Sequence, residues 1–375
     1  MGFFNRRGRQ GVDNNHQQTN DTRRSRHVNS TYSMATRPSF GQWLKVTWLD
    51  ILTFVIMGVI GLGIYEAPPA PTRSFAVTFS DGEVVYPQFA YPYRKEIIPI
   101  WLAAFLAAIV PILAILIMQI RVRSFWDVNN GIIGLLYSLI GAAVFQVFIK
   151  FLIGGLRPHF LDVCKPDISL AKNGAGIEGS PYNAAGFNQL YFTREICTGD
   201  PKEINDSLES FPSGHTTAAF AGFVYLYLYL NAKLKVFANY HAPMWKLIVI
   251  YIPILGAVLI GGALTIDEFH NWYDVCFGAL IGTVMAFTAY RMCYAAIWDW
   301  RFNHVPLNRS QNFQYTNDAE LMDAMWTRSA GWGAGSSAYS DKYANGHGMY
   351  SSGAAGPGIP RKAVPSGQHR GDEMV

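Results

Sequence analysis

The sequence predicts an all-α membrane protein that crosses the bilayer about six times. Half of its 375 residues are hydrophobic, only 15% are charged, and the apolar residues gather in long stretches. A membrane-crossing helix needs roughly 17 to 25 such residues. Backbone polar groups cannot stay unpaired in lipid, so these stretches should be helices. The predicted spans are Leu49–Ile64, Ile97–Ile120, Gly131–Ile153, His215–Leu230, Leu247–Ile266 and Tyr273–Ile297.

The distribution of basic residues predicts the orientation of these spans. Seven arginines precede the first span, Arg121 and Arg123 lie between the second and third, and Lys233, Lys235 and Lys246 lie between the fourth and fifth. Basic residues stay on the cytoplasmic side, which would place both termini there. Segments 65–96 and 154–214 would then face the lumen or the exterior. The first forty residues lack an early apolar core, so no cleavable signal peptide is expected.

Composition divides the chain into three parts. Residues 1–44 form a basic arm, residues 45–300 hold the spans, and residues 301–375 are rich in glycine, serine and tyrosine. Neither end is apolar enough to bury a core, so we expect both to be disordered and cytoplasmic.

Two of the four cysteines, Cys164 and Cys197, lie in the second non-cytoplasmic segment. An oxidising compartment would favour a disulfide between them, and two free thiols are the alternative.

Three groups of polar residues border the spans, and polar residues in such positions suggest function. The first ends the third span with Lys150, Arg157 and Pro158. Residues seven apart share one helix face, so the two cations would repel each other unless an anion lay between them. The alternative is that both side chains reach for the membrane surface.

The second group, Pro212, Ser213, Gly214 and His215, opens the fourth span. Ser213 could simply cap a helix. The same helix start could instead bind an anion through its free amides and its dipole.

The third group contains His270 and Asp274 between the fifth and sixth spans. At a spacing of four, the carboxylate could orient the imidazole and leave its other nitrogen free to attack. The neighbouring Trp272 and Tyr273 could be interfacial anchors. By contrast, His159, His241 and His304 have no partner at a telling spacing, and we interpret them as incidental.

The predicted topology puts all three groups on the non-cytoplasmic side, where together they suit phosphate chemistry. Lys150, Arg157, the hydroxyl of Ser213 and the amides of Ser213 and Gly214 would bind phosphate oxygens. His270 would attack phosphorus and His215 would protonate the leaving alkoxide. Fixed cations and amides would stabilise charge, so no metal or other cofactor is expected.

These motifs, in this order on six spans, resemble the lipid phosphate phosphatases of the type-2 phosphatidate phosphatase superfamily, which shares its site with vanadium-dependent haloperoxidases. The resemblance covers roughly residues 45–300 and extends to fungal members. It implies a phosphatase-type helical bundle. It also implies magnesium-independent hydrolysis of phosphatidate, lysophosphatidate, diacylglycerol pyrophosphate or a related lipid through a phosphohistidine.

One departure from the family pattern concerns phosphate binding. The family's third motif begins with Ser-Arg, where this chain has Ala263 and Leu264. Losing a charge-assisted contact costs on the order of 1.5 to 3 kcal/mol. A loop cation, Lys165, Lys172 or Arg194, could substitute for the arginine.

Three other functions remain open. A weak or inactive relative could bind a lipid phosphate as a regulator or scaffold. A vanadate-dependent haloperoxidase fits less well, because a membrane-embedded site suits amphiphiles better than it suits halide and peroxide. A transporter would be expected to place its charges near the bilayer midplane.

Overall fold

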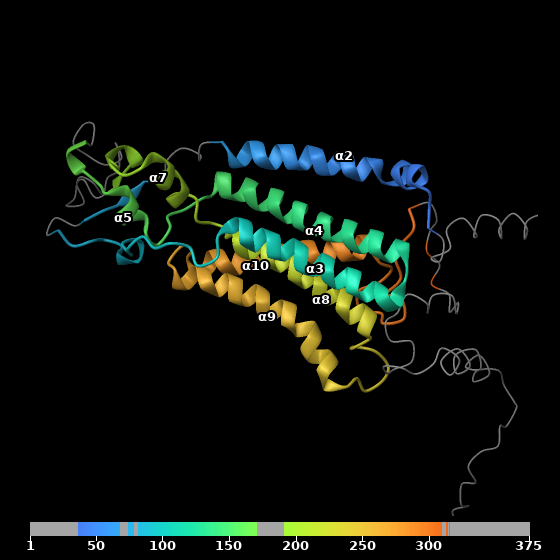
Figure 1. Cartoon of the computed structure of the whole chain (residues 1–375). Helices are drawn as coiled ribbons and strands as arrows, with labels where there is room; N and C mark the ends of the chain where they lie inside the picture. Colours follow the sequence, from blue (N-terminus) through green and yellow to red (C-terminus); the bar gives the residue numbers. More distant parts are fainter. Residues whose placement is uncertain are drawn as a thin grey trace, which may run out of the picture.

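A bundle of long helices forms the body of the protein (Figure 1). The computed structural model describes residues 37–67, 74–78, 82–170, 191–309, 313 and 315. The six long helices are α2 (Phe40–Tyr65), α3 (Ile100–Val122), α4 (Phe125–Leu152), α8 (Gly214–Leu234), α9 (Met244–Ile266) and α10 (Trp272–Cys293). All of them except α8 are long and apolar enough to cross a membrane. The predicted all-α multi-pass membrane protein is thereby confirmed.

Helix α8 occupies the centre of the bundle and packs against α3, α4, α9 and α10. Its polar side chains Thr216, Thr217 and Asn231 are buried among these neighbours. A helix covered by protein need not be uniformly apolar, which explains why α8 does not reach the composition of a membrane span.

Two glycines of α10 set its distance from α8. A Cβ atom on Gly278 would lie 2.7 Å from the carbonyl oxygen of Ser213, and one on Gly282 would lie 2.5 Å from that of Thr217. Small residues four apart let membrane helices approach closely. This contact brings Asp274, one turn before Gly278, to the start of α8.

The boundaries between the bundle and the two ends of the chain differ from the prediction. Helix α2 begins at Phe40, within the predicted arm, because Ser39 and Gln42 form a capping box. Helix α10 ends at Cys293, four residues before Ile297, and the chain then folds back so that the Ala295 amide donates to the Val305 carbonyl. Residues 301–309, assigned to the tail, therefore pack on the bundle.

All three lysines assigned to a cytoplasmic loop are instead buried. Lys233 lies in α8 and Lys246 in α9, both with no exposed surface, and Lys235 directly follows α8 with 4% exposed. The Nζ atom of Lys233 lies 2.5 Å from Asp127 Oδ1 and donates to the His304 carbonyl at 3.0 Å. The ammonium group of Lys233 therefore contacts a carboxylate and a carbonyl instead of the solvent expected for a loop lysine.

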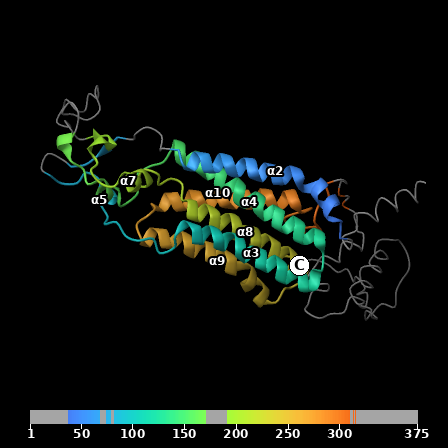
Figure 2. The same cartoon turned by 45° about the horizontal axis from the view of Figure 1, so that its top comes forward.

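Short elements cover one end of the bundle, opposite to the start of α2 (Figures 1 and 2). Strand β1 (Phe75–Ala76) pairs antiparallel with β2 (Tyr191–Phe192), which joins the segment after α2 to the segment after α4. The other short elements are η1 (Pro87–Phe89), α5 (Phe160–Cys164), η2 (Ile168–Leu170), η3 (Arg194–Ile196) and α7 (Pro201–Ser207).

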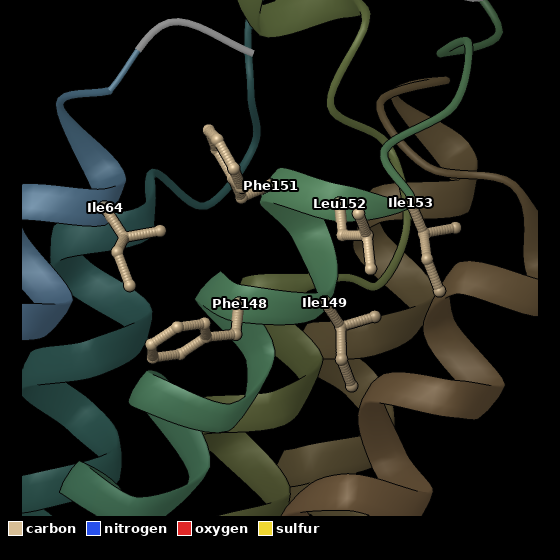
Figure 3. A pocket seen from close by; sticks show the side chains of 6 residues that line it. All are labelled: Ile64, Phe148, Ile149, Phe151, Leu152 and Ile153. Atoms are coloured by element: carbon tan, nitrogen blue, oxygen red, sulfur yellow. The ribbon is translucent and has the colours of Figure 1, made fainter. Parts of the chain in front are cut away.

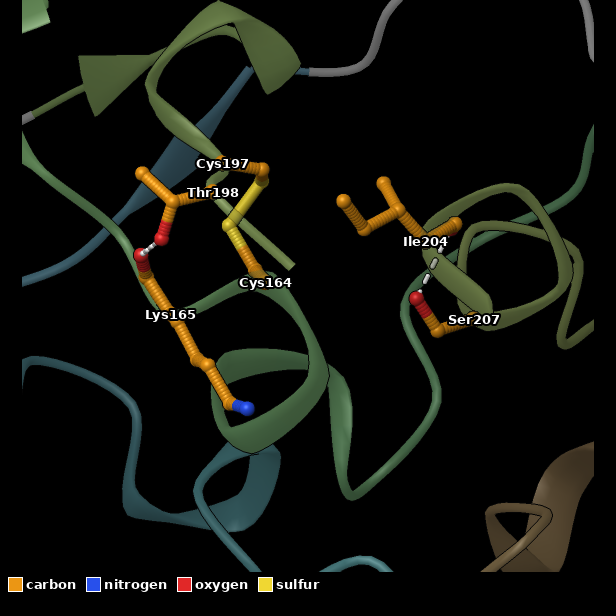
Figure 4. The surroundings of a disulfide bond; sticks show 6 residues. All are labelled: Cys164, Lys165, Cys197, Thr198, Ile204 and Ser207. Carbon is orange, nitrogen blue, oxygen red and sulfur yellow. Dashed lines mark hydrogen bonds between the residues drawn. A yellow bond between two sulfur atoms is a disulfide. The ribbon is translucent and has the colours of Figure 1, made fainter. Parts of the chain in front are cut away.

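Cys164 and Cys197 form the predicted disulfide, which ties the end of α5 to the chain after η3 (Figure 4). The Thr198 hydroxyl reinforces this link by donating to the Lys165 carbonyl at 2.8 Å. Residues 1–36, residues 316–375 and Lys172 lie outside the described residues.

Candidate active site

The loop after α4 positions Arg157 by pairing with α7. Gly154 and Gly155 adopt positive φ angles of 52° and 125°, which glycine tolerates best. The Gly155 amide then donates to the Leu208 carbonyl at 2.8 Å, and the Arg157 amide to the Ser207 carbonyl at 2.9 Å. Arg157 therefore lies beside the end of α7.

The guanidinium of Arg157 is buried and held on two sides. Its Nε donates to the Asp206 carbonyl at 3.0 Å, and its Nη2 to Asp206 Oδ1 at 2.7 Å. Its carbon lies 5.2 Å from the centre of the Phe269 ring, a cation–π contact. One nitrogen, Nη1, is buried without a hydrogen bond to the described residues.

Two more basic groups also face carboxylates. Lys150 Nζ lies 3.6 Å from Glu209 Oε2, and His215 Nε2 lies 3.9 Å from Glu96 Oε1. Burial raises the pKa of both Glu96 and Glu209, against the opposing effect of Arg157 and Lys150. These carboxyl groups therefore accept a proton more readily than free glutamate does, and protonation would reduce their repulsion of an anion.

Ser213 caps α8, as the capping interpretation predicted, and its hydroxyl accepts from the Thr216 amide at 3.4 Å. Its own amide donates to the Asp274 carbonyl at 3.1 Å, so that amide is not open to phosphate as the sequence interpretation assumed. The Gly214 amide lies in the first turn, where the helix supplies no backbone acceptor.

The two motif prolines connect neighbouring elements. The Pro212 carbonyl accepts from Gln146 Nε2 of α4 at 3.2 Å, and the Pro158 carbonyl accepts from the Tyr91 amide at 3.1 Å. Pro158 therefore anchors the first motif to the segment before α3, and Pro212 anchors the second motif to α4.

The chain turns sharply between α9 and α10 to present His270. The Leu264 carbonyl accepts the amides of Phe269 and His270 at 3.1 and 3.2 Å. His270 Nδ1 then lies 3.6 Å from Asp274 Oδ2. This separation exceeds a direct hydrogen bond, but catalytic contacts commonly tighten only when substrate binds.

Asp274 is oriented by two residues that the sequence analysis did not single out. Its Oδ2 atom accepts from the Ser210 hydroxyl at 2.5 Å, and from the backbone and side-chain amides of Asn271 at 3.0 and 3.2 Å. Three donors to one oxygen fix the rotamer of this carboxylate.

Burial lowers the pKa of His270 to about 4, although the nearby Asp274 carboxylate opposes the shift. The imidazole is therefore neutral at neutral pH, as a nucleophile requires. The rings of His215 and His270 lie 6.3 Å apart, centre to centre, so both can reach one small group.

Buried polar atoms are nearly always hydrogen-bonded, and the exceptions here concentrate at this site. In the described part of the chain six buried side-chain atoms lack a hydrogen bond. Four of these belong to it: Arg157 Nη1, His215 Nε2, His270 Nδ1 and Asp274 Oδ1. Such a concentration is typical of a ligand site.

A segment before α3, residues 91–98, touches all three motifs and was missed by the sequence analysis. Besides Glu96 on His215, the Tyr93 ring packs at 5.0 Å from His159 and 5.9 Å from Phe269. The Ile97 amide donates to Asp267 Oδ2 at 3.1 Å. The available signal was a run of charges, Arg94, Lys95 and Glu96, directly before an apolar span.

The interpretation of two histidines as incidental was wrong. His159 is buried and its Nδ1 atom lies 2.9 Å from the Glu268 carbonyl, which joins the first motif to the third. At the other end of the bundle, His304 Nδ1 lies 2.8 Å from Lys235 Nζ. Both partners are distant in sequence, so helical spacing could not reveal them.

The positions that depart from the family pattern are buried, with Ala263 9% and Leu264 0% exposed. Of the proposed substitutes, Arg194 donates to Asn205 Oδ1 at 3.0 Å, and Lys165 is exposed at the end of α5. Across the described ranges, no group of three or more His, Cys, Asp or Glu residues is arranged to hold a metal ion.

Comparison with known proteins identifies the family. Residues 131–298 match the model of the PAP2 superfamily. The chain is 34% identical to lipid phosphate phosphatase 1 of Arabidopsis thaliana over 57% of this chain and 60% of that protein. It is 31% identical to lipid phosphate phosphatase 2 of the same plant, over 67% of this chain and 78% of the relative.

A fungal relative matches over a greater share of its length. Diacylglycerol pyrophosphate phosphatase 1 of Saccharomyces cerevisiae is 30% identical over 67% of this chain and 80% of that protein. No solved structure matches the chain. These relatives are named as phosphatases, so the predicted resemblance to phosphoric monoester hydrolases, including fungal ones, is confirmed. The chain belongs to the PAP2 superfamily.

Proposed function

We propose that the protein is a magnesium-independent lipid phosphate phosphatase acting on phosphatidate, lysophosphatidate, diacylglycerol pyrophosphate or a related lipid. One observation carries the proposal. Basic, nucleophilic and acid–base side chains from three separate motifs converge, and four of their buried polar atoms make no hydrogen bond within the described part of the chain. The names of the relatives support the same class of substrate.

In the proposed mechanism the phosphate binds to Lys150, Arg157, the Ser213 hydroxyl and the Gly214 amide. Asp274 accepts a hydrogen bond from Nδ1 of His270, which leaves Nε2 to attack phosphorus. As the phosphorus–nitrogen bond forms, the ester bond breaks, and His215 donates a proton to the departing alkoxide. Water, deprotonated by His215, then cleaves the phosphohistidine and releases inorganic phosphate.

The site is proposed to face the lumen or the exterior, with both termini in the cytoplasm. The basic residues near the opposite end support this orientation. Protease added to sealed vesicles whose cytoplasmic face points outward tests this orientation. The protease should remove an epitope tag from either terminus, and a protected tag would contradict the proposal.

A second candidate is a weak or inactive relative that binds a lipid phosphate. Two observations favour it: position 264 carries a buried leucine, and carboxylates lie beside Lys150, Arg157 and His215. These carboxylates compete with phosphate for the cations.

Phosphate release by the purified full chain in detergent, with chelator and without magnesium, separates the two candidates. The wild-type protein should release phosphate from at least one of these lipids. His270→Ala should lose more than about 10³-fold in rate because the nucleophile is gone. Release by His270→Ala at the wild-type rate would refute the mechanism, and no release by folded wild-type protein would favour the second candidate.

A further inference from the structure

An apolar groove of about 410 Å³ lies between the outer ends of α2 and α4 (Figure 3). It is lined by Ile64, Phe148, Ile149, Phe151, Leu152 and Ile153. Small-molecule sites typically measure about 300 to 1,000 Å³, so the groove can hold part of a lipid chain.

Both walls of this groove lie at the end of the bundle that carries the candidate phosphate site (Figure 1). On α4, the lining residues Ile149 and Phe151 flank Lys150, whose Nζ atom lies near Glu209. On α2, Ile64 lies in the last turn of the helix, at the same end of the bundle as Lys150 in the last turn of α4 (Figure 1). An anionic headgroup bound at Lys150 and Arg157 would therefore lie at the mouth of the groove.

We propose that this groove holds the acyl chain of the phosphate-bearing lipid, next to a headgroup bound by Lys150 and Arg157. The inference rests on the proposed function. It commits to one occupant because the groove joins an apolar surface to a cationic one, a combination that matches an anionic amphiphile. A bulk membrane lipid without a phosphate monoester would match the apolar part alone.

The groove contributes orientation more than attraction. An acyl chain that leaves the bilayer or a micelle for an apolar groove gains little hydrophobic free energy, since both surroundings are apolar. Holding the first part of the chain does fix the angle at which the ester bond meets His270. Misplacement by about 1 Å can cost up to about 100-fold in rate, so the effect should appear in kcat.

The test compares two substrates and two variants of the purified full chain. Ile64→Trp fills the groove, whereas Val59→Trp adds the same side chain to the exposed side of α2, where Val59 is 66% exposed. The readout is the ratio of kcat for dioleoyl phosphatidate to kcat for dibutyryl phosphatidate, whose chains are too short to need the groove.

Ile64→Trp should lower this ratio about tenfold, and Val59→Trp should leave it unchanged. An unchanged ratio in folded Ile64→Trp would overturn the groove while leaving the proposed function intact. If the wild-type protein hydrolyses neither lipid, the proposed function and the groove both fail.

Photochemical crosslinking provides a second test that needs no variant. A phosphatidate with a diazirine near the start of its acyl chain should label Ile64 or residues 148–153 of the wild-type protein. Dioleoyl phosphatidate should compete with this labelling, and dioleoyl phosphatidylcholine should not. Labelling only elsewhere, or equal competition by both lipids, would contradict the proposal.

Discussion

At the scale of single residues, the chemistry of His270 depends on its surroundings. Burial keeps the imidazole neutral, and Asp274 faces its Nδ1 atom at 3.6 Å. Asp274 itself is fixed by Ser210 and by Asn271. The reactive nitrogen is therefore oriented through a chain of contacts that starts outside the His270–Asp274 motif.

Asp274→Asn tests this orientation. The amide preserves the shape of the side chain but removes the charge that selects the tautomer of His270, so kcat should fall about 10²- to 10⁴-fold. Steady-state kinetics measure the loss, and Ser210→Ala should show a smaller loss in the same direction. Wild-type kcat in Asp274→Asn would mean that the carboxylate does not orient the nucleophile.

Leu264→Arg combined with Ala263→Ser tests the departure from the family pattern. Leu264 is fully buried, and its carbonyl holds the amide of His270, so an arginine here starts close to the site. Phosphate should inhibit the double variant at a roughly tenfold lower concentration, because one charge-assisted contact is added. No change in the inhibition constant would indicate that another cation already serves this role.

At the scale of elements, residues 91–98 connect motifs that are far apart in the chain. The Tyr91 amide reaches the first motif at Pro158, Glu96 reaches the second at His215, and Ile97 reaches the third at Asp267. We infer that this segment aligns the acid–base histidine with the nucleophile. Glu96 acts as a positioning residue because it touches His215 and not the reacting atoms.

Glu96→Gln should lower kcat about tenfold and leave KM nearly unchanged. The Glu96 carboxylate lies 3.9 Å from Nε2 of His215, so its replacement by an amide should hold the acid–base imidazole less firmly. Steady-state kinetics measure the change. Glu203→Gln, on exposed α7, is the matched control, and wild-type kcat in Glu96→Gln would contradict the assigned role.

At the scale of the whole molecule, the bundle carries a polar cluster at each end. At the end opposite the site, Asp127 lies against Lys233 and accepts from Tyr229 and Tyr294 at 2.8 and 3.1 Å. There the charges of Asp127 and Lys233 are paired with each other. At the site end, four buried side-chain atoms make no hydrogen bond within the described part of the chain and stay available to a ligand.

The histidines of the site end make stability depend on pH. The pKa of His159 and that of His270 are each lowered by burial from 6.5 to about 4. As pH falls below 6.5, the unfolded chain binds protons before the folded one does. The free energy of unfolding should therefore decrease as the pH falls to about 4. Each of the two histidines should contribute on the order of 1 kcal/mol per pH unit to this decrease.

Thermal unfolding in detergent between neutral pH and pH 4 measures this dependence. His159→Phe keeps an aromatic ring between Tyr93 and Phe269 but cannot take up a proton, so its melting temperature should depend less on pH. His241→Phe, which changes an exposed histidine, should behave like the wild-type protein. Equal pH dependence in all three proteins would show that burial of His159 is not coupled to folding.

The sequence by itself determined the long helices and the family, and it predicted the candidate site residues. Apolar run lengths predicted the six long helices to within a few residues at most ends. The predicted shared helix faces were wrong, because α4 ends at Leu152, before Arg157, and α10 begins at Trp272, after His270. Run length is a local signal, because membrane thickness acts on neighbouring residues.

Only the tertiary structure decided which distant groups meet. Contacts between separate elements bring Asp206 to Arg157, Glu96 to His215 and Ser210 to Asp274. The residues after Cys293 fold back in the same way. The groove between α2 and α4 likewise exists only once the two helices pack. Such contacts depend on helix packing and loop closure, which no periodicity in a single segment encodes.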